Sequence, residues 1–164
     1  MTLQIRRATL ADAESIADHN AAMARETENV QLDPQRLRLG VDAVLNDPGK
    51  GFYTVAEAEA PVVGQMVVGH QVVGQMMITF EWSDWRNGTF WWVQSVYVQP
   101  DYRRRGVYRR LYEHVLREAK SRSDVCGVRL YVDKGNRAAQ QVYERLGMNR
   151  AQYAMYEVDF VLNR

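Results

Sequence analysis

Cysteine and histidine are scarce in this 164-residue chain, which has one cysteine and three histidines. The lone Cys126 cannot form a disulfide within the chain, and it excludes a metal cluster built on several cysteines. It lies just before an apolar, β-branched run, so we expect a buried structural thiol rather than a nucleophile. The histidines share no metal-ligand spacing (His19, His70 and His114). We therefore expect no metal site.

The chain also lacks a surplus of either charge and any long apolar run. Its 21 basic and 20 acidic side chains give a net charge of +1, which argues against bulk nucleic-acid binding. No apolar run approaches the roughly 18–20 residues that span a bilayer, and no charged-then-apolar signal segment opens the chain. We expect a cytoplasmic protein that binds neither nucleic acid nor membrane.

The remaining composition is typical of one soluble domain over residues 1–164. Hydrophobic residues make up 46% and charged residues 25%, and a chain of this length can bury a core without disulfides. Hydrophobic periodicity and turn residues then predict the elements along the chain. The expected strands cover residues 3–6, 52–56, 72–80, 89–98, 128–132 and 153–161, and the expected helices begin at Thr9, Asp33, Gly106 and Asn136.

This order, β-α-α-β-β-β-α-β-α-β, predicts an α/β fold with a mixed, mostly antiparallel central sheet flanked by helices. Asn87-Gly88 is a strong hairpin signal between two of the strands. The segment Val62–Met66 recurs as Val72–Met76, an even offset that presents the same residues to one face of a sheet. We interpret this as a local duplication that lengthens the hairpin between the second and third strands, without chemistry of its own.

The most informative stretch runs from Val96 to Tyr108. A β-branched and aromatic strand stops at Pro100, crosses a basic turn, and restarts at Gly106 as a helix with an apolar stripe. Backbone amides and arginines of such a turn point at whatever lies on the helix N-terminus. The arrangement favours an anion, most often a phosphate.

The same stretch resembles the signature of the Gcn5-related N-acetyltransferases (GNAT), which is Arg/Gln-x-x-Gly-x-Gly/Ala. Arg103, Gly106 and Tyr108 occupy its fixed places, although a small residue is usual where Tyr108 stands. The resemblance implies the GNAT fold over essentially the whole chain, with the diphosphate of acetyl-CoA on this turn and the pantetheine arm beside the preceding strand. It assigns cofactor binding to Val96, Tyr97, Val98, Arg103, Arg104, Arg105, Gly106, Val107, Tyr108, Arg109 and Asn136.

A second motif resembles the same family. The string from Asn136 to Met148 is similar to the pattern Asn-x-x-Ala-x-x-x-Tyr-x-x-x-Gly-Phe/Met. Asn136 and Tyr143 are seven residues apart, which is two helical turns and hence one face. The resemblance implies that Asn136 reaches the pantetheine and that Tyr143 protonates the leaving thiolate.

No general base stands out. Related polyamine acetyltransferases have a glutamate on the strand before the cofactor turn, and the matching residue here is Gln94. The nearest acidic candidates are Glu81, as catalytic base, and Asp84. With Trp82 they would bind a cationic amine through charge and cation–π contacts. A purely structural hairpin is the alternative, and the acceptor site would then lie near residues 26–28 of the first predicted helix.

We therefore expect an N-acetyltransferase that uses acetyl-CoA and no metal, acting by direct transfer in a ternary complex. The expected acceptor is a small-molecule primary amine, either a polyamine, a diamine or an amino-acid-like compound. Acetylation of a protein or peptide N-terminus or lysine is the alternative enzyme reading, and a non-catalytic CoA-binding sensor is the alternative without catalysis. Dimers through the last strands are common in the family, so a homodimer is a further expectation.

Overall fold

The computed structural model describes residues 2–59, 62–63, 66–67 and 69–161, which form two compact units. The first unit, residues 1–131, holds all the strands and three of the four α-helices found in the described residues. Its strands are β1 (Leu3–Arg7), β2 (Phe52–Glu59), β3 (Val62–Val63), β4 (Met66–Val67), β5 (His70–Ser83), β6 (Gly88–Val98) and β7 (Val125–Leu130), and its helices are α1 (Ala13–Glu28), α2 (Pro34–Asn46) and α3 (Val107–Lys120). The second unit, residues 132–164, contains helix α4 (Arg137–Arg145).

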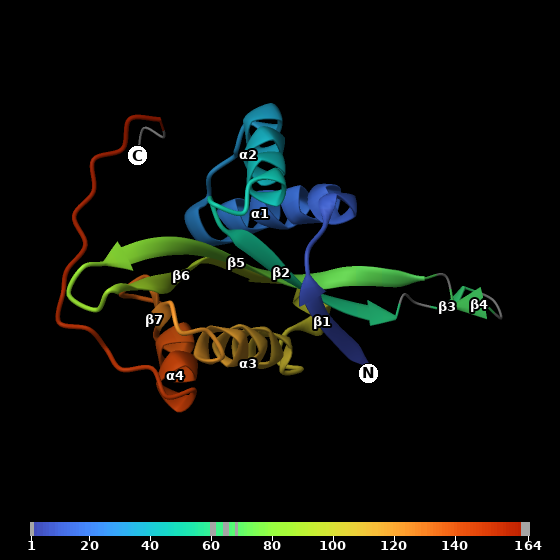
Figure 1. Ribbon diagram of the computed structural model, residues 1–164. Coiled ribbons are helices and arrows are strands. Elements are labelled where there is room, and N and C mark those ends of the chain that lie inside the picture. Colours follow the sequence, from blue (N-terminus) through green and yellow to red (C-terminus); the bar gives the residue numbers. More distant parts are fainter. Residues whose placement is uncertain (1, 60–61, 64–65, 68, 162–164) are drawn as a thin grey trace. The chain divides into compact units, whose positions relative to one another are not determined.

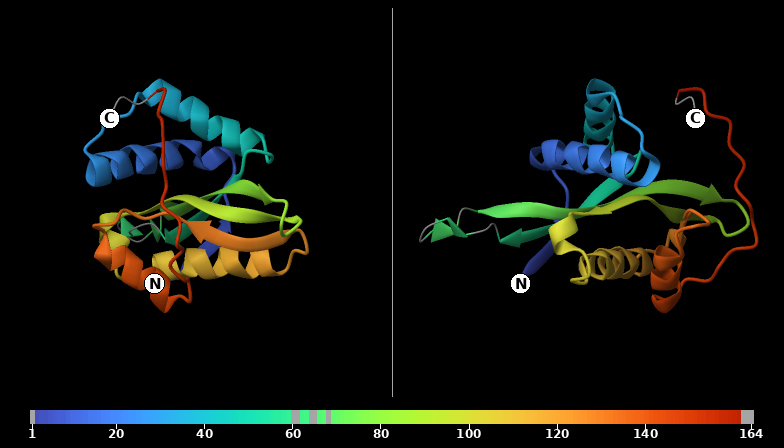
Figure 2. Two further views of the ribbon diagram at one scale, coloured as in Figure 1. Left: turned by 90° about the vertical axis from the view of Figure 1, so that its left-hand side faces the viewer. Right: turned by 180° about the vertical axis from the view of Figure 1, so that it is seen from behind.

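Five strands of the first unit form one sheet in the order β1-β2-β5-β6-β7. Neighbouring strands are antiparallel except β6 and β7, which are parallel, so the sheet is mixed and mostly antiparallel as predicted. Helices α1 and α2 cover one face of this sheet and α3 covers the other (Figures 1 and 2). None of the described helices has the length and apolar character needed to cross a lipid bilayer.

Buried apolar side chains on both faces of the sheet explain this layered arrangement. On one face Ile16 and Val41, from α1 and α2, pack in a common core with Val55 of β2. The helical stripe of α3 is buried as well, including Leu111 and Val115. Amphipathic helices therefore close both faces of the sheet in this unit.

The helix starts predicted at Asp33, Gly106 and Asn136 and the hairpin turn are confirmed, whereas Thr9 precedes a short 3-10 helix (Leu10–Asp12) and α1 begins at Ala13. The side chain of Asp33 accepts a hydrogen bond from the Arg36 amide at 2.6 Å, directly before Pro34 at the first position of α2. Asn136 caps α4 in the same way. Asn87 adopts a left-handed φ of 44°, and Gly88 pairs with Ser83 across the β5–β6 hairpin.

Two predicted strands differ from the structure. β7 begins three residues earlier than expected, so the half-buried Cys126 lies inside this strand rather than before it. The strand predicted for residues 153–161 is wrong, because residues 149–161 form neither helix nor strand and their large apolar side chains are exposed. An alternating pattern gives only β-propensity, and a strand forms only where a neighbouring strand satisfies its backbone.

The duplicated segment lies between β2 and β5. Glu59 at the end of β2 pairs with His70 at the start of β5, so the residues between them form an insertion at the tip of this hairpin. Within the insertion, β3 and β4 pair as a separate two-stranded antiparallel sheet. Residues 64–65 of the first copy lie outside the described residues, whereas the second copy lies within β5. The hairpin is thus extended, as the duplication predicts.

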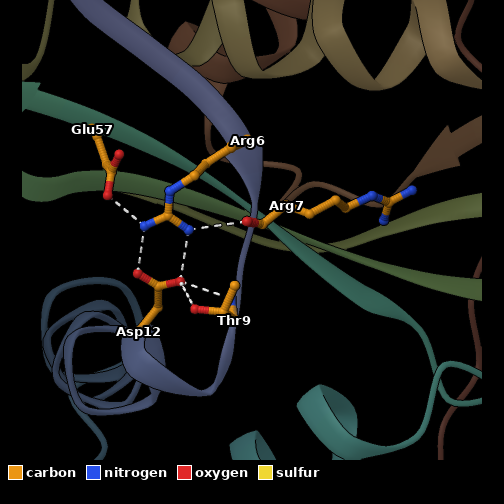
Figure 3. Close-up of polar contacts among 5 residues, drawn as sticks. All are labelled: Arg6, Arg7, Thr9, Asp12 and Glu57. Atoms are coloured by element: carbon orange, nitrogen blue, oxygen red, sulfur yellow. Dashed lines mark hydrogen bonds and ion pairs between the residues drawn. The ribbon is translucent and has the colours of Figure 1, made fainter.

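A buried carboxylate ties the start of α1 to the edge of the sheet. Both guanidinium Nη atoms of Arg6 donate to the Asp12 carboxylate at 2.8 Å, and Glu57 of β2 accepts a further bond from Arg6 (Figure 3). The amide of Thr9 donates to Asp12 at 2.7 Å. The Arg6 guanidinium holds the pKa of Asp12 below its ordinary value.

We expect Asp12→Asn to lower the free energy of unfolding by about 2 kcal/mol, because it leaves the partly buried Arg6 with one carboxylate fewer. Since folding lowers the pKa of Asp12, its contribution is complete at neutral pH and is lost as the pH falls below about 4. Urea unfolding at pH 7 and at decreasing pH measures both effects.

The matched control is Asp42→Asn, which removes a carboxylate paired with exposed Arg38 on α2. An exposed i,i+4 pair contributes only about 0.5 kcal/mol, so this variant should stay close to wild type. An equal loss of stability in both variants would contradict the anchoring role of Asp12.

Candidate functional site

One edge of β6 pairs with a neighbouring strand over only about half of its length. It pairs with β5 as far as Val98, but with β7 only over Thr89–Val93. No described strand pairs with the Gln94–Val98 stretch on the β7 side. Apart from the Val98 carbonyl, which accepts from Arg103, the backbone groups along that edge have no strand partner there and suit an extended ligand that adds to a sheet by strand-like pairing.

A β-bulge marks the point where this edge opens. Val93 and Ser95 pair with the successive residues Ile78 and Met77, which leaves Gln94 as an extra residue in β6. Because the bulge shifts the alternation by one residue, Trp92, Ser95 and Tyr97 share the face covered by α1. The side chain of Gln94 donates to the Tyr131 hydroxyl at 3.0 Å, just after the end of β7.

The predicted anion-binding turn follows β6. Arg104 and Gly106 both have left-handed backbone conformations, with φ of 61° and 78°, and Gly106 directly precedes α3. The first helical hydrogen bond runs from the Arg110 amide to the Gly106 carbonyl at 3.1 Å. The amides of residues 107–109 therefore have no acceptor within the helix, and an anion at this terminus would meet them.

Arg103 holds the turn through contacts with two other elements. Its Nε donates to the Val98 carbonyl at 2.9 Å, and its Nη2 forms an ion pair with Glu26 of α1 at 2.5 Å. Its guanidinium lies 5.4 Å from the centre of the Tyr97 ring. Arg103 therefore holds the turn against the end of β6 and against α1, so the turn is fixed before any ligand binds.

The other predicted cofactor residues of the turn are arranged differently. Arg109 pairs with Glu113 at 2.7 Å on the outer surface of α3, and the Arg105 guanidinium lies 5.7 Å from the centre of the Tyr102 ring. Tyr108 stacks against Tyr112 one turn further along α3, with ring centres 6.2 Å apart. The large side chain at the usual small position thus lies along the helix.

Glu26 connects α1 to the same region. Besides its ion pair with Arg103, its carboxylate accepts a hydrogen bond from the Tyr97 hydroxyl at 2.8 Å. Arg103 and then Tyr97 lower the pKa of Glu26, whereas burial and the nearby carboxylate raise the pKa of Tyr97. The C-terminal turn of α1 is thereby held over the strand that precedes the cofactor turn.

The predicted acceptor residues lie at the other end of β6. Glu81 is in register with Phe90, four residues before Gln94, which is roughly 13 Å along the strand. Its carboxylate accepts from Arg129 Nη1 at 2.7 Å. A proton from an amine at the bulge would need a water relay to reach Glu81.

The tryptophans do not gather around Glu81 and Asp84 in one pocket. Trp82 and Trp85, near the hairpin tip, are 62% and 88% exposed. Trp91 packs against Phe52 on one face of the sheet, with ring centres 5.0 Å apart. Trp92 packs against Tyr131 on the opposite face at 5.8 Å. Alternation along β6 therefore separates two of the residues that the sequence places next to each other.

Sequence reasoning missed Arg129 and Tyr131. Arg129 lies in β7, with its guanidinium 3.5 Å from the centre of the Phe90 ring and 5.8 Å from that of Trp92. Its signal was a single charged residue within the apolar run that predicts this strand. Tyr131 connects the same aromatic surface to Gln94.

The second unit holds the predicted proton donor. Within it, the Asn136 side-chain oxygen accepts from the Ala139 amide at 3.1 Å, so Asn136 is the N-cap of α4. Tyr143 is half-buried, and burial raises the pKa of its hydroxyl above the ordinary value near 10. A tyrosine in this state is protonated at neutral pH. Pantetheine binding by Asn136 and proton transfer by Tyr143 stay predictions.

A hollow of the first unit lies elsewhere. It has a volume of about 580 Å³ and lies on the sheet face opposite Trp92, lined among others by Arg7, Phe52 and Trp91. We place the candidate site along β6 instead, because the open edge and the turn are on that strand. Within the described residues, no group of three or more histidine, cysteine or acidic side chains is arranged to hold a metal ion.

Comparison with known proteins finds a family pattern and similar structures. The acetyltransferase (GNAT) family pattern matches residues 21–148. A possible acetyltransferase from Clostridium difficile 630 is 40% identical, with a TM-score of 0.84 over 99% of this chain and 100% of that chain. No curated protein matches the sequence.

More distant structures share the fold. One is a ribosomal-protein-alanine N-acetyltransferase from Brucella melitensis biovar Abortus 2308, 19% identical, with a TM-score of 0.70 over 97% of this chain and 100% of that one. Another is an aminoglycoside N-acetyltransferase in complex with CoA, 14% identical, with a TM-score of 0.71 over 98% of this chain and 96% of that one.

Proposed function

This chain belongs to the GNAT family of acetyl-CoA-dependent N-acetyltransferases, and we propose that its acceptor is the primary amine of a small molecule, either a polyamine, a diamine or an amino-acid-like compound. The observation that carries the acetyl-CoA site of this proposal is the edge of β6 without a described strand partner, which runs from the bulge at Gln94 to the turn before α3. It aligns a strand-like ligand site with an anion site on one strand.

The turn and the strand would divide the binding of acetyl-CoA between them. The free amides at the start of α3, with the exposed arginines beside them, suit the diphosphate. The open edge of β6 suits the amide groups of the pantetheine arm. A backbone N–H of this edge, aimed at the thioester carbonyl, would stabilise the negative charge that develops on its oxygen.

The transfer itself requires two proton movements. The nitrogen lone pair of the amine forms a bond to the thioester carbonyl carbon, and the carbon–sulfur bond then breaks. Tyr143 would donate its proton to the leaving sulfur. Gln94, which has no ionisable group, cannot accept the proton from the nitrogen, so a water molecule would carry it away, with Glu81 as a more distant acceptor.

Release of free CoA tests this function directly. We expect thiol release above the rate of spontaneous hydrolysis with at least one member of a panel of polyamines, amino acids, aminoglycosides and peptides. Mass spectrometry of the product would locate the acetyl group on a primary amine. If only peptides are acetylated, the protein-acetyltransferase reading replaces this one. If acetyl-CoA binds without release by any amine, a sensor role replaces it.

A further inference from the structure

The hollow on the sheet face opposite Trp92 has an aromatic floor that the proposed acetyl-CoA site does not use. Three of its lining rings are in mutual contact: the ring centre of Phe52 lies 5.0 Å from that of Trp91 and 6.1 Å from that of Phe80. The Phe80 and Trp91 centres are 6.5 Å apart. Trp91 is buried, whereas Phe80 is 39% exposed. Phe80 therefore offers an aromatic surface to a molecule in the hollow.

The hollow is large enough for a small aromatic molecule. Its volume of about 580 Å³ falls within the roughly 300–1,000 Å³ of typical small-molecule sites. Thr89, which also lines it, is in register with Trp82 of β5, and directly paired residues of antiparallel strands project to the same face. Because Trp82 is 62% exposed, aromatic surface continues from the floor of the hollow towards the hairpin tip.

Two arginines bring positive charge to the same hollow. The Arg7 guanidinium carbon lies 3.0 Å from the centre of the Phe52 ring, and its Nη2 donates to Glu118 of α3. Arg122 follows α3 and donates to Asp124 through Nε at 3.0 Å and Nη2 at 2.8 Å. Among the described residues, neither Nη1 of Arg122 nor Nε and Nη1 of Arg7 make a hydrogen bond. Both guanidinium groups thus keep N–H donors for a ligand.

The place of Arg7 determines which charge suits the hollow. Its guanidinium already occupies the cation–π position over Phe52, so a cationic ligand would meet a covered ring and two positive groups. Burial, and then the nearby charge of Arg122, lower the pKa of Arg7, whereas Glu118 raises it. The two arginines therefore repel each other, and an anion beside them would reduce this repulsion.

We propose that the hollow is a second ligand site, which binds a planar aromatic molecule that carries a carboxylate. The ring of the ligand packs on Phe80, and its carboxylate accepts a hydrogen bond from Arg122 next to the charge of Arg7. Trp91 of the floor precedes the bulge at Gln94 by three residues, which is roughly 10 Å along the strand. We therefore expect this ligand and acetyl-CoA to bind together.

Three matched ligands test the site, because they share a ring system and differ in charge: 2-naphthoate, 2-naphthamide and (2-naphthyl)trimethylammonium. We expect the Kd of the wild-type protein for the acid to be about tenfold lower than that for the amide, since a charge-assisted hydrogen bond is the stronger one. The cation should bind most weakly. Titration calorimetry gives the three values, and saturation of the protein with CoA should leave the Kd for naphthoate unchanged.

Variants then separate the charge from the ring surface. Arg122→Gln should raise the Kd for naphthoate about tenfold and that for naphthamide less than about threefold, whereas Asp124→Asn should lower the Kd for naphthoate by freeing the guanidinium. Phe80→Ala should raise the Kd for both ligands alike. Arg129→Gln is the matched control, because Arg129 is also paired with a carboxylate and lies over a ring, but on the opposite face of the sheet. It should leave every Kd unchanged.

Each contrary outcome bears on a particular step. Equal Kd for the acid and the amide, or wild-type affinity for naphthoate in Arg122→Gln, would overturn the carboxylate assignment. Tightest binding of the cation would make the hollow a cation site instead. Displacement of naphthoate by CoA would place the ligand on β6, and no binding of any of the three would remove the site. Acetyl transfer to an amine is tested separately by CoA release, so its failure would leave this inference standing.

Discussion

Replacing Gly106 with valine should abolish measurable acetyl-CoA binding while leaving the protein folded. Gly106 has a φ of 78° and directly precedes α3, so its left-handed conformation sets the direction of the free amides of the first helical turn. A β-branched side chain resists this conformation, and it would also stand between the backbone and a bound diphosphate. Titration calorimetry with acetyl-CoA measures the loss.

The fold should survive because a Cβ added at Gly106 meets nothing within 4 Å. Gly69→Val is the matched control, since Gly69 has a φ of 81° and equally open surroundings but lies before β5. Both variants should lose about 1–2 kcal/mol of stability from backbone strain, and only Gly106→Val should lose the ligand. Near-normal affinity in Gly106→Val would remove the turn as the cofactor site.

The elements that local chemistry specifies could be predicted from the sequence. Asp33 before Pro34 and Asn136 before α4 provide an oxygen for a free amide, so each helix start needs only its own few residues. The Asn87-Gly88 turn likewise sets the β5–β6 hairpin. The predicted strand at residues 153–161 failed because strand formation depends on a partner outside the segment.

In the candidate site, too, features built from contiguous residues could be predicted, and features that depend on distant strand pairing could not. The geometry of the turn before α3 could be predicted because its strand, glycine and helix are contiguous in the chain. Arg129 could not, because its place beside Trp92 depends on the parallel pairing of β7 with β6, which no local pattern encodes. The same pairing neutralises Glu81, which the sequence presents as an unpaired carboxylate among tryptophans.

The contact of Glu26 with Arg103 has the same origin. The two residues are separated by 77 positions in the chain and meet because α1 packs over the end of β6. The sequence motif assigns Arg103 to the ligand, which stays a prediction, and the structure adds its contacts with the Val98 carbonyl and Glu26. A residue at a fixed motif position can thus act by positioning the backbone that binds.

The second large effect is expected at Tyr143. Tyr143→Phe keeps the ring and removes the hydroxyl, so turnover should fall roughly ten- to a thousandfold while acetyl-CoA affinity changes little. Burial raises the pKa of Tyr143, which keeps its proton in place at neutral pH. Steady-state kinetics with the best acceptor, combined with calorimetry, separates the two quantities.

The pH dependence of kcat gives an independent reading of the same residue. A group that must donate a proton loses activity as the pH rises through its pKa, and the raised pKa of Tyr143 places this fall above about 10. Tyr143→Phe should remove that limb of the profile. Tyr156→Phe, which loses a hydroxyl from a 94% exposed ring in the same unit, is the control and should retain it. Unchanged turnover in Tyr143→Phe would reduce Tyr143 to a packing residue and make water the acid that protonates the leaving sulfur.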